Sequence, residues 1–206
     1  MAGREGLVTS NGTRIAVRER STRETVIRVR VDLDGTGISE ISTGVGFYDH
    51  LLTSFAHHSL IDIEIAATGD LHIDEHHTVE DVALVLGDAL SAALGDRAGI
   101  ARFGDAVVPM DDALASVALD LSGRPYAVLD LTFRGERVGT LSTQLVEHIL
   151  ESFARTLGAN LNIRASGRND HHIAEATFKA LARSMRAAVA IDPRRAGVAS
   201  TKGSLG

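Results

Sequence analysis

The sequence contains the pattern His-His-x-x-Glu twice, at 76–80 and at 171–175. The chain has no cysteine, so a transition metal would be bound by imidazole and carboxylate groups. Neighbouring residues of a helix point about 100° apart, and we therefore expect the two histidines of each pair to serve different ions. Each glutamate follows its histidines by three and four residues and could join either of them. The repeated pattern predicts metal chemistry at two sites.

One further histidine precedes each pair in a matching context. The segment YDHLLTSF at 48–55 aligns with VEHILESF at 146–153, which places His50 over His148. Shared between two ions, the full set gives each ion four ligands. Four ligands close a tetrahedral zinc site, but they leave two positions open in the octahedral site of an ion that binds substrate. The predicted ligands are His50, His76, His77, Glu80, His148, His171, His172 and Glu175.

Three other histidines have no counterpart in the other half of the sequence. They are His57, His58 and His72, and we expect them to have ordinary structural roles. His58 is the best functional candidate of the three, because it ends the expected helix that carries His50. The sequence does not indicate a role for His57 or His72.

The duplication extends to the elements that must position these residues. Apolar and polar residues alternate at 27–34 and at 117–121, a pattern typical of strands buried on one face. The other expected elements also recur in pairs: helices at 46–58 and 143–158, strands at 60–67 and 160–166, and helices at 76–94 and 171–190. We predict an α+β fold of tandem duplicated half-domains, in which two mainly antiparallel sheets flank a four-helix layer.

The expected organisation is one compact domain made of four segments. They are a first half-repeat at 1–96, a connection at 97–112, a second half-repeat at 113–191 and a flexible, substrate-binding tail at 192–206. Pro193 and several glycines favour flexibility in the tail. The pattern does not define strand boundaries within 130–143.

Composition excludes several classes of partner. The chain of 206 residues has a net charge of −6, which argues against a nucleic acid or an anionic membrane as a partner held by electrostatics. No uncharged apolar run approaches the roughly 20 residues of a membrane helix. Residues 1–12 lack the apolar core of a signal peptide. We therefore predict no membrane partner and a cytoplasmic location.

Seven segments together make the sequence resemble the imidazoleglycerol-phosphate dehydratase family of histidine biosynthesis. They are FYDHLL (47–52), DEHHTVED (74–81), RFGDA (102–106), PMDDAL (109–114), DLSGRP (120–125), NDHHIAEA (169–176) and STKG (200–203). The match runs in order along nearly the whole chain. The sequence departs from the family at Gly46, where Pro is usual, and in the poorly matched stretch 130–143.

The resemblance implies a lyase that dehydrates D-erythro-imidazole-glycerol phosphate to imidazole-acetol phosphate. It implies two Mn²⁺ ions per subunit, bound by the ligands predicted above, and self-association into a large octahedral homo-oligomer of roughly 24 subunits. It also makes Glu24 an acid–base candidate, with Glu80 and Glu175 as further catalytic residues. The implied substrate- and phosphate-binding residues, to which we add His58, are Glu24, Arg102, Arg124, Lys179, Ser200 and Lys202.

Our hypothesis for the reaction is a metal-bound imidazolate-type intermediate. It would acidify the carbon between the ring and the hydroxyl, and Glu24 would move the proton of that carbon. The sequence leaves open which group protonates the departing hydroxyl, which metal is native and whether each metal site closes within one subunit or between subunits. Two alternatives use the same ligands: another di-metal enzyme, hydrolase or oxygenase, and a non-catalytic metal-linked assembly protein.

Overall fold

A computed structural model of the chain describes residues 13–205. Its first half contains β1 (Ile15–Ser21), β2 (Thr25–Asp32), β3 (Ser39–Ser42), α1 (Gly46–Ser59), β4 (Asp62–Gly69) and α2 (His76–Leu94). Its second half contains β5 (Phe103–Met110), β6 (Ala113–Asp120), β7 (Tyr126–Leu131), β8 (Arg137–Val138), β9 (Leu141–Ser142), α3 (Gln144–Leu157), β10 (Asn160–Ser166) and α4 (Asp170–Val189). Residues 1–12, for which we predicted no signal peptide, lie outside the described residues.

Each half forms one four-stranded sheet, and the two sheets have the same topology. Their strand orders are β1-β2-β4-β3 and β5-β6-β10-β7. Neighbouring strands are antiparallel, except that β3 lies parallel to β4 and β7 lies parallel to β10. In β2 the side chains of Ile27, Val29 and Val31 are buried, whereas Arg28 between them is exposed. The predicted α+β fold with two mainly antiparallel sheets is confirmed.

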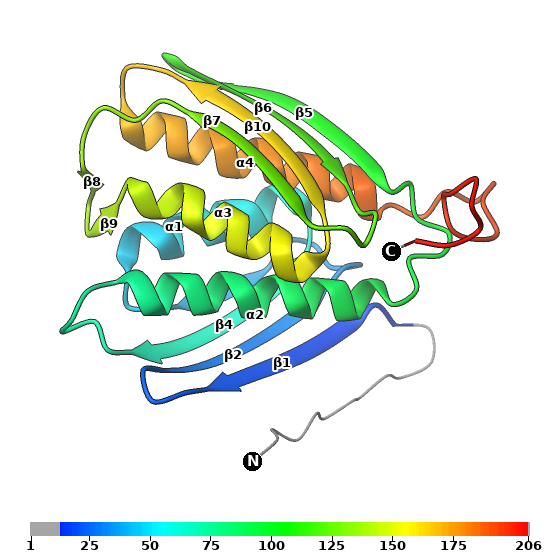
Figure 1. The fold of residues 1–206 in the computed structure, drawn as a ribbon, viewed down its shortest axis with the longest axis horizontal. Coiled ribbons are helices and arrows are strands. Elements are labelled where there is room, and N and C mark those ends of the chain that lie inside the picture. The colour runs from blue at the N-terminus through cyan, green and yellow to red at the C-terminus, as the bar shows by residue number, and fades with distance from the viewer. Residues whose placement is uncertain (1–12, 206) are drawn as a thin grey trace.

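The four helices form one layer between the two sheets (Figure 1). α2 packs on β1, β2 and β4, and α4 packs on β5, β6 and β10. α1 packs on α4, and α3 packs on α2. The contact between α2 and α3 is close at Gly87, where a Cβ would lie 2.7 Å from the carbonyl oxygen of Phe153. Each helix pair therefore joins one helix from each half, which brings the two copies of the sequence motif together.

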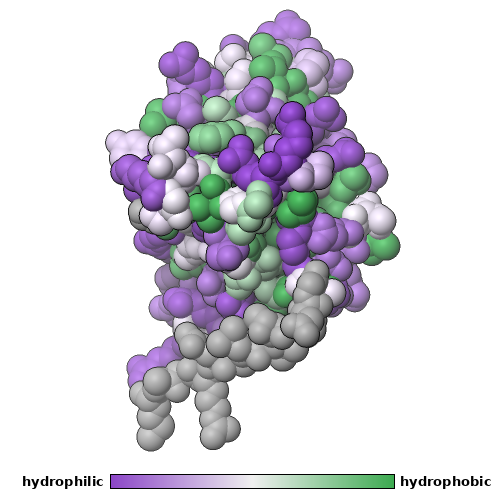
Figure 2. Space-filling view, turned by 90° about the vertical axis from the view of Figure 1, so that its right-hand side faces the viewer, coloured by the Kyte–Doolittle hydropathy of each residue, from purple (hydrophilic) through white to green (hydrophobic). Residues whose placement is uncertain are grey.

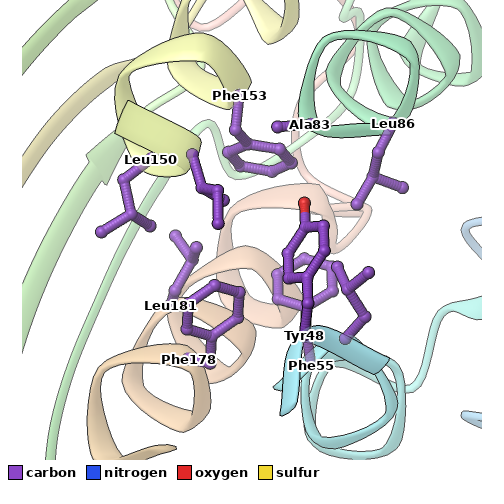
Figure 3. A pocket seen from close by; sticks show the side chains of 10 residues that line it. Tyr48, Phe55, Ala83, Leu86, Leu150, Phe153, Phe178 and Leu181 are labelled. Carbon is purple, nitrogen blue, oxygen red and sulfur yellow. The ribbon is translucent and has the colours of Figure 1, made fainter. Parts of the chain in front are cut away.

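A small apolar cavity lies among the four helices (Figure 3). Its volume is about 10 Å³, and its lining includes Phe55, Phe153 and Phe178. The hydroxyl of Tyr48 is buried at this cavity without a hydrogen-bond partner among the described residues. Burial raises the pKa of Tyr48 far above its ordinary value. A space of this size holds at most one water molecule and offers it few polar partners, so we do not assign it a ligand.

The structure differs from the sequence prediction between the halves. The segment expected to be a connection, 97–112, contains β5, which has the same edge position in the second sheet as β1 in the first. Phe103 and Val107 on the outward face of β5 are exposed and apolar, so the strand lacks the alternation that would have identified it. The undefined stretch 130–143 contains the end of β7 and the β8–β9 hairpin.

The described part of the tail, 192–205, lies against the segment that precedes β5. The amide of Gly99 donates to the carbonyl of Gly197 at 3.1 Å, and the guanidinium of Arg102 donates to the carbonyl of Ala199 at 2.6 Å. These contacts hold a segment that the composition predicted to be flexible. None of the helices described between residues 13 and 205 is long and apolar enough to cross a membrane.

Candidate metal centres

The first cluster of candidate ligands lies between α1 and α4. Nε2 of His50 on α1 lies 3.0 Å from Oε2 of Glu175 on α4. Nε2 of His171, also on α4, lies 3.1 Å from the same oxygen. The three ligand atoms all lie within 4.8 Å of one another, a spacing that one metal ion could span. We call His50, His171 and Glu175 the α1–α4 cluster.

The second cluster lies between α2 and α3 and repeats the same arrangement. Oε2 of Glu80 on α2 lies 3.6 Å from Nε2 of His76 and 3.2 Å from Nε2 of His148 on α3. These ligand atoms also lie within 4.8 Å of one another. We call His76, Glu80 and His148 the α2–α3 cluster. Because the helices pair across the halves, each cluster combines ligands from both copies of the motif.

In both clusters a cation binds the second oxygen of the glutamate. Nζ of Lys179 lies 2.7 Å from Oε1 of Glu175, and the guanidinium of Arg155 lies 3.5 Å from Oε1 of Glu80. Burial raises the pKa of Glu175, but hydrogen bonds from Lys179 and His50 outweigh this effect and hold that pKa at about 2. Glu175 is therefore a carboxylate at neutral pH, as a metal ligand must be.

Asx caps set where the two motif-bearing helices begin. Oδ1 of Asp74 accepts a hydrogen bond from the amide of His76 at 2.8 Å, and Oδ1 of Asn169 accepts one from the amide of His171 at 2.9 Å. Such side chains satisfy amide groups that have no partner within the helix. The caps place both His-His pairs in a first helical turn, where their side chains reach the edge of the helix layer.

The second histidine of each pair lies outside both clusters. Nδ1 of His77 lies 3.0 Å from Oδ2 of Asp70, and Nδ1 of His172 lies 2.7 Å from Oδ1 of Asp112. These contacts raise the pKa of His77 and strongly lower the pKa of Asp112. A carboxylate on Nδ1 is the arrangement that usually orients a metal-binding histidine and leaves its Nε2 for the ion. The structure therefore groups six of the eight predicted ligands into two clusters of three residues. The other two predicted ligands, His77 and His172, belong to neither cluster.

Sequence reasoning missed the two aspartates that orient these histidines. Asp70 precedes His77 by one short loop, and Asp112 lies at the turn before β6, in the PMDD segment. The position of Asp70 just before the motif was a usable signal, since a short loop keeps it nearby. Asp112 is distant in the sequence from His172, and only the second sheet brings the two together.

Glu24 lies beside His77 rather than beside either cluster. Its carboxylate is half-exposed and lies 4.0 Å from Nδ1 of His77, and its carbonyl accepts a hydrogen bond from the amide of Asp70. His58, by contrast, lies near the end of α1, about two helical turns beyond His50. Burial, followed by the charges of His57 and Lys179, lowers the pKa of His58. Of the predicted phosphate-binding residues, Lys179 alone contacts a cluster residue within the described part of the chain.

The other predicted phosphate-binding residues lie at the opposite end of the helix layer. The amide of Arg102 bonds the carbonyl of Ala188 near the end of α4, roughly 26 Å along the helix from His171. Arg102 also forms a two-pronged ion pair with Asp120, at 2.6 and 2.9 Å. Ser200 and Lys202 follow the tail residue that Arg102 binds. This end carries many hydrophilic side chains with hydrophobic ones between them (Figure 2).

Arg124 also lies at the end remote from the clusters. It is exposed in the turn that follows β6, and the neighbouring Gly123 donates its amide to the carbonyl of Gly158, which ends α3. Within one chain the structure therefore separates Arg102, Arg124, Ser200 and Lys202 from the two clusters.

Comparison with known proteins gives one consistent family. Residues 43–185 match the family model described as imidazoleglycerol-phosphate dehydratase. A chloroplastic imidazoleglycerol-phosphate dehydratase of Pisum sativum is 54% identical over 94% of this chain and 69% of its own length. The enzyme of that name from Methanococcoides burtonii is 56% identical over 90% of this chain and 96% of its own.

Solved structures agree with the sequence relatives. The imidazoleglycerol-phosphate dehydratase of Staphylococcus aureus superimposes with a TM-score of 0.79 at 35% identity, over 86% of this chain and 99% of its own. The dehydratase of Pyrococcus furiosus, solved in complex with (S)-C348, has a TM-score of 0.79 at 39% identity, over 91% of this chain and 100% of its own. The chain therefore belongs to the imidazoleglycerol-phosphate dehydratase family, and it is a dehydratase, a hydro-lyase enzyme.

Proposed function

We propose that this protein dehydrates imidazole-glycerol phosphate to imidazole-acetol phosphate in histidine biosynthesis, with two Mn²⁺ ions bound per subunit. The family and the names of the relatives support the reaction. The observation that carries the metal proposal is the duplicated cluster of two histidines and one glutamate. Imidazole nitrogen and carboxylate oxygen suit Mn²⁺ and leave room for a substrate ligand.

The α2–α3 cluster contains a nitrogen atom for which residues 13–205 provide no hydrogen-bond partner. Nε2 of His148 is buried, and although it lies 3.2 Å from Oε2 of Glu80, the geometry is not that of a hydrogen bond. A buried polar atom without a partner is costly, and a metal ion at the centre of the cluster would satisfy it. The residues present therefore fit a metal ion.

We propose that a neighbouring copy of the chain completes each cluster. His172 cannot join His171 on one ion, because adjacent helical residues diverge, so His77 is the available fourth ligand for the α1–α4 cluster. By the same argument His172 completes the α2–α3 cluster. Both histidines are already oriented by carboxylates at Nδ1. Shared ligands of this kind support a closed homo-oligomer, for which the family resemblance implies roughly 24 subunits.

The position of the phosphate-binding candidates supports the same conclusion. A small substrate cannot reach both the clusters and Arg102 within one copy, because they lie at opposite ends of the helix layer. We propose that the tail of one copy, with Ser200 and Lys202, and the exposed Arg124 meet the clusters of another. Fork-shaped Arg and point-charge Lys suit a phosphate monoester.

The formulas of substrate and product determine which bonds change. The hydroxyl must leave the carbon that carries the ring, and a proton must leave the next carbon, so the products are water and an enol that becomes the ketone. This corrects the hypothesis that the ring-bearing carbon loses the proton. Bound metal ions supply Lewis acidity toward the imidazole ring and the hydroxyl.

The chain's own residues bind the substrate and move the proton. The carboxylate of Glu24 lies 4.0 Å from Nδ1 of His77. When His77 joins the α1–α4 cluster of a neighbouring copy, Glu24 therefore lies at the same site. Its carboxylate takes the proton from the carbon adjacent to the ring-bearing carbon and gives a proton to the ring-bearing carbon as the enol becomes the ketone. The O–H proton that the enol loses in that step balances the proton that the departing hydroxide takes up to become water. Glu80 and Glu175 remain charged ligands, and Lys179 binds the phosphate end beside Glu175.

The decisive experiment is to incubate the Mn²⁺-loaded protein with imidazole-glycerol phosphate and follow the enol and ketone by ultraviolet absorbance. Metal analysis of protein purified without added ions identifies the native metal. Loss of turnover in Arg124→Ala with metal content unchanged would contradict a purely metal-linked assembly protein. A carboxylate-bridged hydrolase centre is not favoured, because among the described residues the two clusters share no carboxylate.

A further inference from the structure

One segment of the second half contacts the starts of both helices that carry His-His pairs. Residues 134–143, which contain the β8–β9 hairpin, lie at the end of the molecule where α2 and α4 begin (Figure 1). Glu75 immediately precedes His76, and Asp170 immediately precedes His171. Both of these carboxylates accept hydrogen bonds from the segment 134–143.

The contact with α2 is made through a buried carboxylate. Oε1 of Glu75 accepts hydrogen bonds from the guanidinium of Arg137 at 2.7 Å and from the amide of Ser142 at 2.9 Å. The same guanidinium nitrogen donates to the carbonyl of Thr140. Glu75 is 9% exposed, so the loss of Arg137 would leave a buried charge without its partner.

The contact with α4 is made through backbone amides. Asp170 accepts hydrogen bonds from the amide of Arg134 at 3.0 Å and from the amide of Gly135 at 2.6 Å. A Cβ at Gly135 would lie 3.1 Å from Oδ2 of Asp170, so a larger residue there would push against this carboxylate. Thr143 joins the two ends of the segment. Its hydroxyl donates to the carbonyl of Gly135 at 2.7 Å, and its amide donates to the backbone carbonyl of Glu136 at 2.9 Å.

We propose that the segment 134–143 is a clasp that couples the two metal clusters, with Glu75 and Asp170 as positioning residues. The inference rests on the proposed metal function of the clusters. The clusters lie on different helix pairs and share no residue among those described. The clasp gives their helix starts a continuous polar connection, so a displacement at one start is transmitted to the other.

Coupling is tested by measuring one cluster while perturbing the other. His148→Ala disables the α2–α3 cluster and leaves the α1–α4 cluster to be titrated with Mn²⁺, by calorimetry or by the electron paramagnetic resonance of free Mn²⁺. In that background, with His77→Ala added so that a neighbouring copy cannot supply His77 to the cluster, Glu75→Gln should lower the Mn²⁺ affinity of the α1–α4 cluster by about tenfold, since Glu75 then reaches this cluster through the segment 134–143. Glu64→Gln, an exposed carboxylate paired with Arg30, is the matched control and should leave the affinity unchanged.

The reciprocal variant tests transmission in the opposite direction. In a His50→Ala background that also carries His172→Ala, so that α4 supplies no ligand to the other cluster, Asp170→Asn should weaken Mn²⁺ binding at the α2–α3 cluster by a similar factor. Gly135→Ala disturbs the contact between Gly135 and Asp170 without removing a charge. It replaces Asp170→Asn in this test if that variant does not fold. Arg137→Ala should weaken both clusters, and Arg137→Lys, which keeps a cation at Glu75, should restore part of the affinity.

The outcomes separate the clasp from the function on which it rests. If each substitution lowers Mn²⁺ affinity only at the cluster on its own helix, the clasp is refuted, while the metal sites themselves are not. If the unaltered protein binds no Mn²⁺, the proposed metal function fails and the clasp fails with it. A measurement on metal-free protein is independent of affinity: Glu75→Gln should speed amide hydrogen exchange at 171–173 in the first turn of α4, and unchanged exchange would also contradict coupling.

Discussion

At the scale of single residues, the two clusters have the same arrangement of two histidines and one glutamate, but a different basic side chain contacts each glutamate. One carboxylate oxygen of each glutamate faces two histidines, and the other faces Lys179 in one cluster and Arg155 in the other. The orienting aspartates, Asp70 and Asp112, also correspond in role although they come from different elements. The duplication has therefore conserved the ligand arrangement while the groups around it have diverged.

The acid–base role of Glu24 predicts a loss of turnover without a loss of metal. Glu24→Gln keeps the size of the side chain but cannot take a proton, so kcat should fall by about 10² to 10⁴. Manganese content and oligomeric mass should stay unchanged, because Glu24 approaches His77 only to 4.0 Å. Turnover close to that of the unaltered protein would refute the assignment.

The unpartnered hydroxyl of Tyr48 predicts a stabilising substitution. Tyr48→Phe removes a buried polar atom that has no hydrogen-bond partner among the described residues and keeps the ring that lines the cavity with Phe55 and Leu86. The free energy of unfolding should rise by about 1 kcal/mol. Urea unfolding measures the change, with Tyr126→Phe as control because Tyr126 is 65% exposed. A destabilised Tyr48→Phe protein would show that the hydroxyl has a bound partner.

At the scale of elements, hydrogen bonds between side chains and backbone amides support the starts of α1, α2 and α4. Asp74 and Asn169 accept the amides of His76 and His171, and Asp49, in the first turn of α1, accepts hydrogen bonds from the amide and hydroxyl of Thr43. Asp62 holds the loop before β3, because Oδ1 accepts the amides of residues 36–38 at 2.8–2.9 Å. These local contacts position the elements on which the clusters depend.

The contacts of Asp62 predict a pH-dependent contribution to stability. Burial raises the pKa of Asp62, but the three backbone hydrogen bonds lower it overall. Since the pKa is lower in the folded state than in the unfolded chain, the stabilisation is present above the ordinary value of 3.8 and is lost as the pH falls below it. Asp62→Asn should lower the free energy of unfolding by about 1 kcal/mol at neutral pH and by less in acid.

Urea unfolding of the metal-free protein at pH 7 and near pH 3 provides the measurement for Asp62. Glu40→Gln changes an exposed carboxylate on β3 and is the control. A difference between Asp62→Asn and the unaltered protein that is equally large at both pH values would show that the charge of Asp62 does not contribute.

At the scale of the whole molecule, the arrangement supports the proposed assembly of several copies of the chain. The clusters and the clasp lie at one end of the helix layer, and Arg102 with the tail lies at the other. His77 and His172 are oriented by carboxylates but belong to neither cluster of their own chain. Copies that meet end to end would complete both the metal sites and the phosphate site.

Metal removal should therefore dissociate the assembly. Treatment with a chelator should lower the mass measured by light scattering, and added Mn²⁺ should restore it. His77→Ala should mimic the chelator, whereas His57→Ala should not, because the described structure places His57 in neither cluster. A mass that does not change in chelator would refute sharing of the metal sites between subunits.

The sequence by itself determined the four helices, the strands at 27–34, 60–67, 117–121 and 160–166, and the set of candidate ligands, but it did not identify β1, β3 or β7. Alternation at 27–34 and helical spacing around His50 and His148 depend only on local periodicity, and the repeated His-His-x-x-Glu needs no tertiary information. It did not identify β5, because Phe103 and Val107 hide the alternation of that strand. It also left the hairpin at 134–143 undefined.

Only the tertiary structure decided which ligands meet. The pairing of α1 with α4 and of α2 with α3 places His50 with Glu175 and His148 with Glu80, across the two halves. That pairing depends on how two sheets pack on one helix layer, and no short-range pattern encodes it. The separation of Arg102 from the clusters has the same origin, since the length of α4 sets it. The residue types thus follow from the sequence, while their division between sites follows from packing over the whole chain.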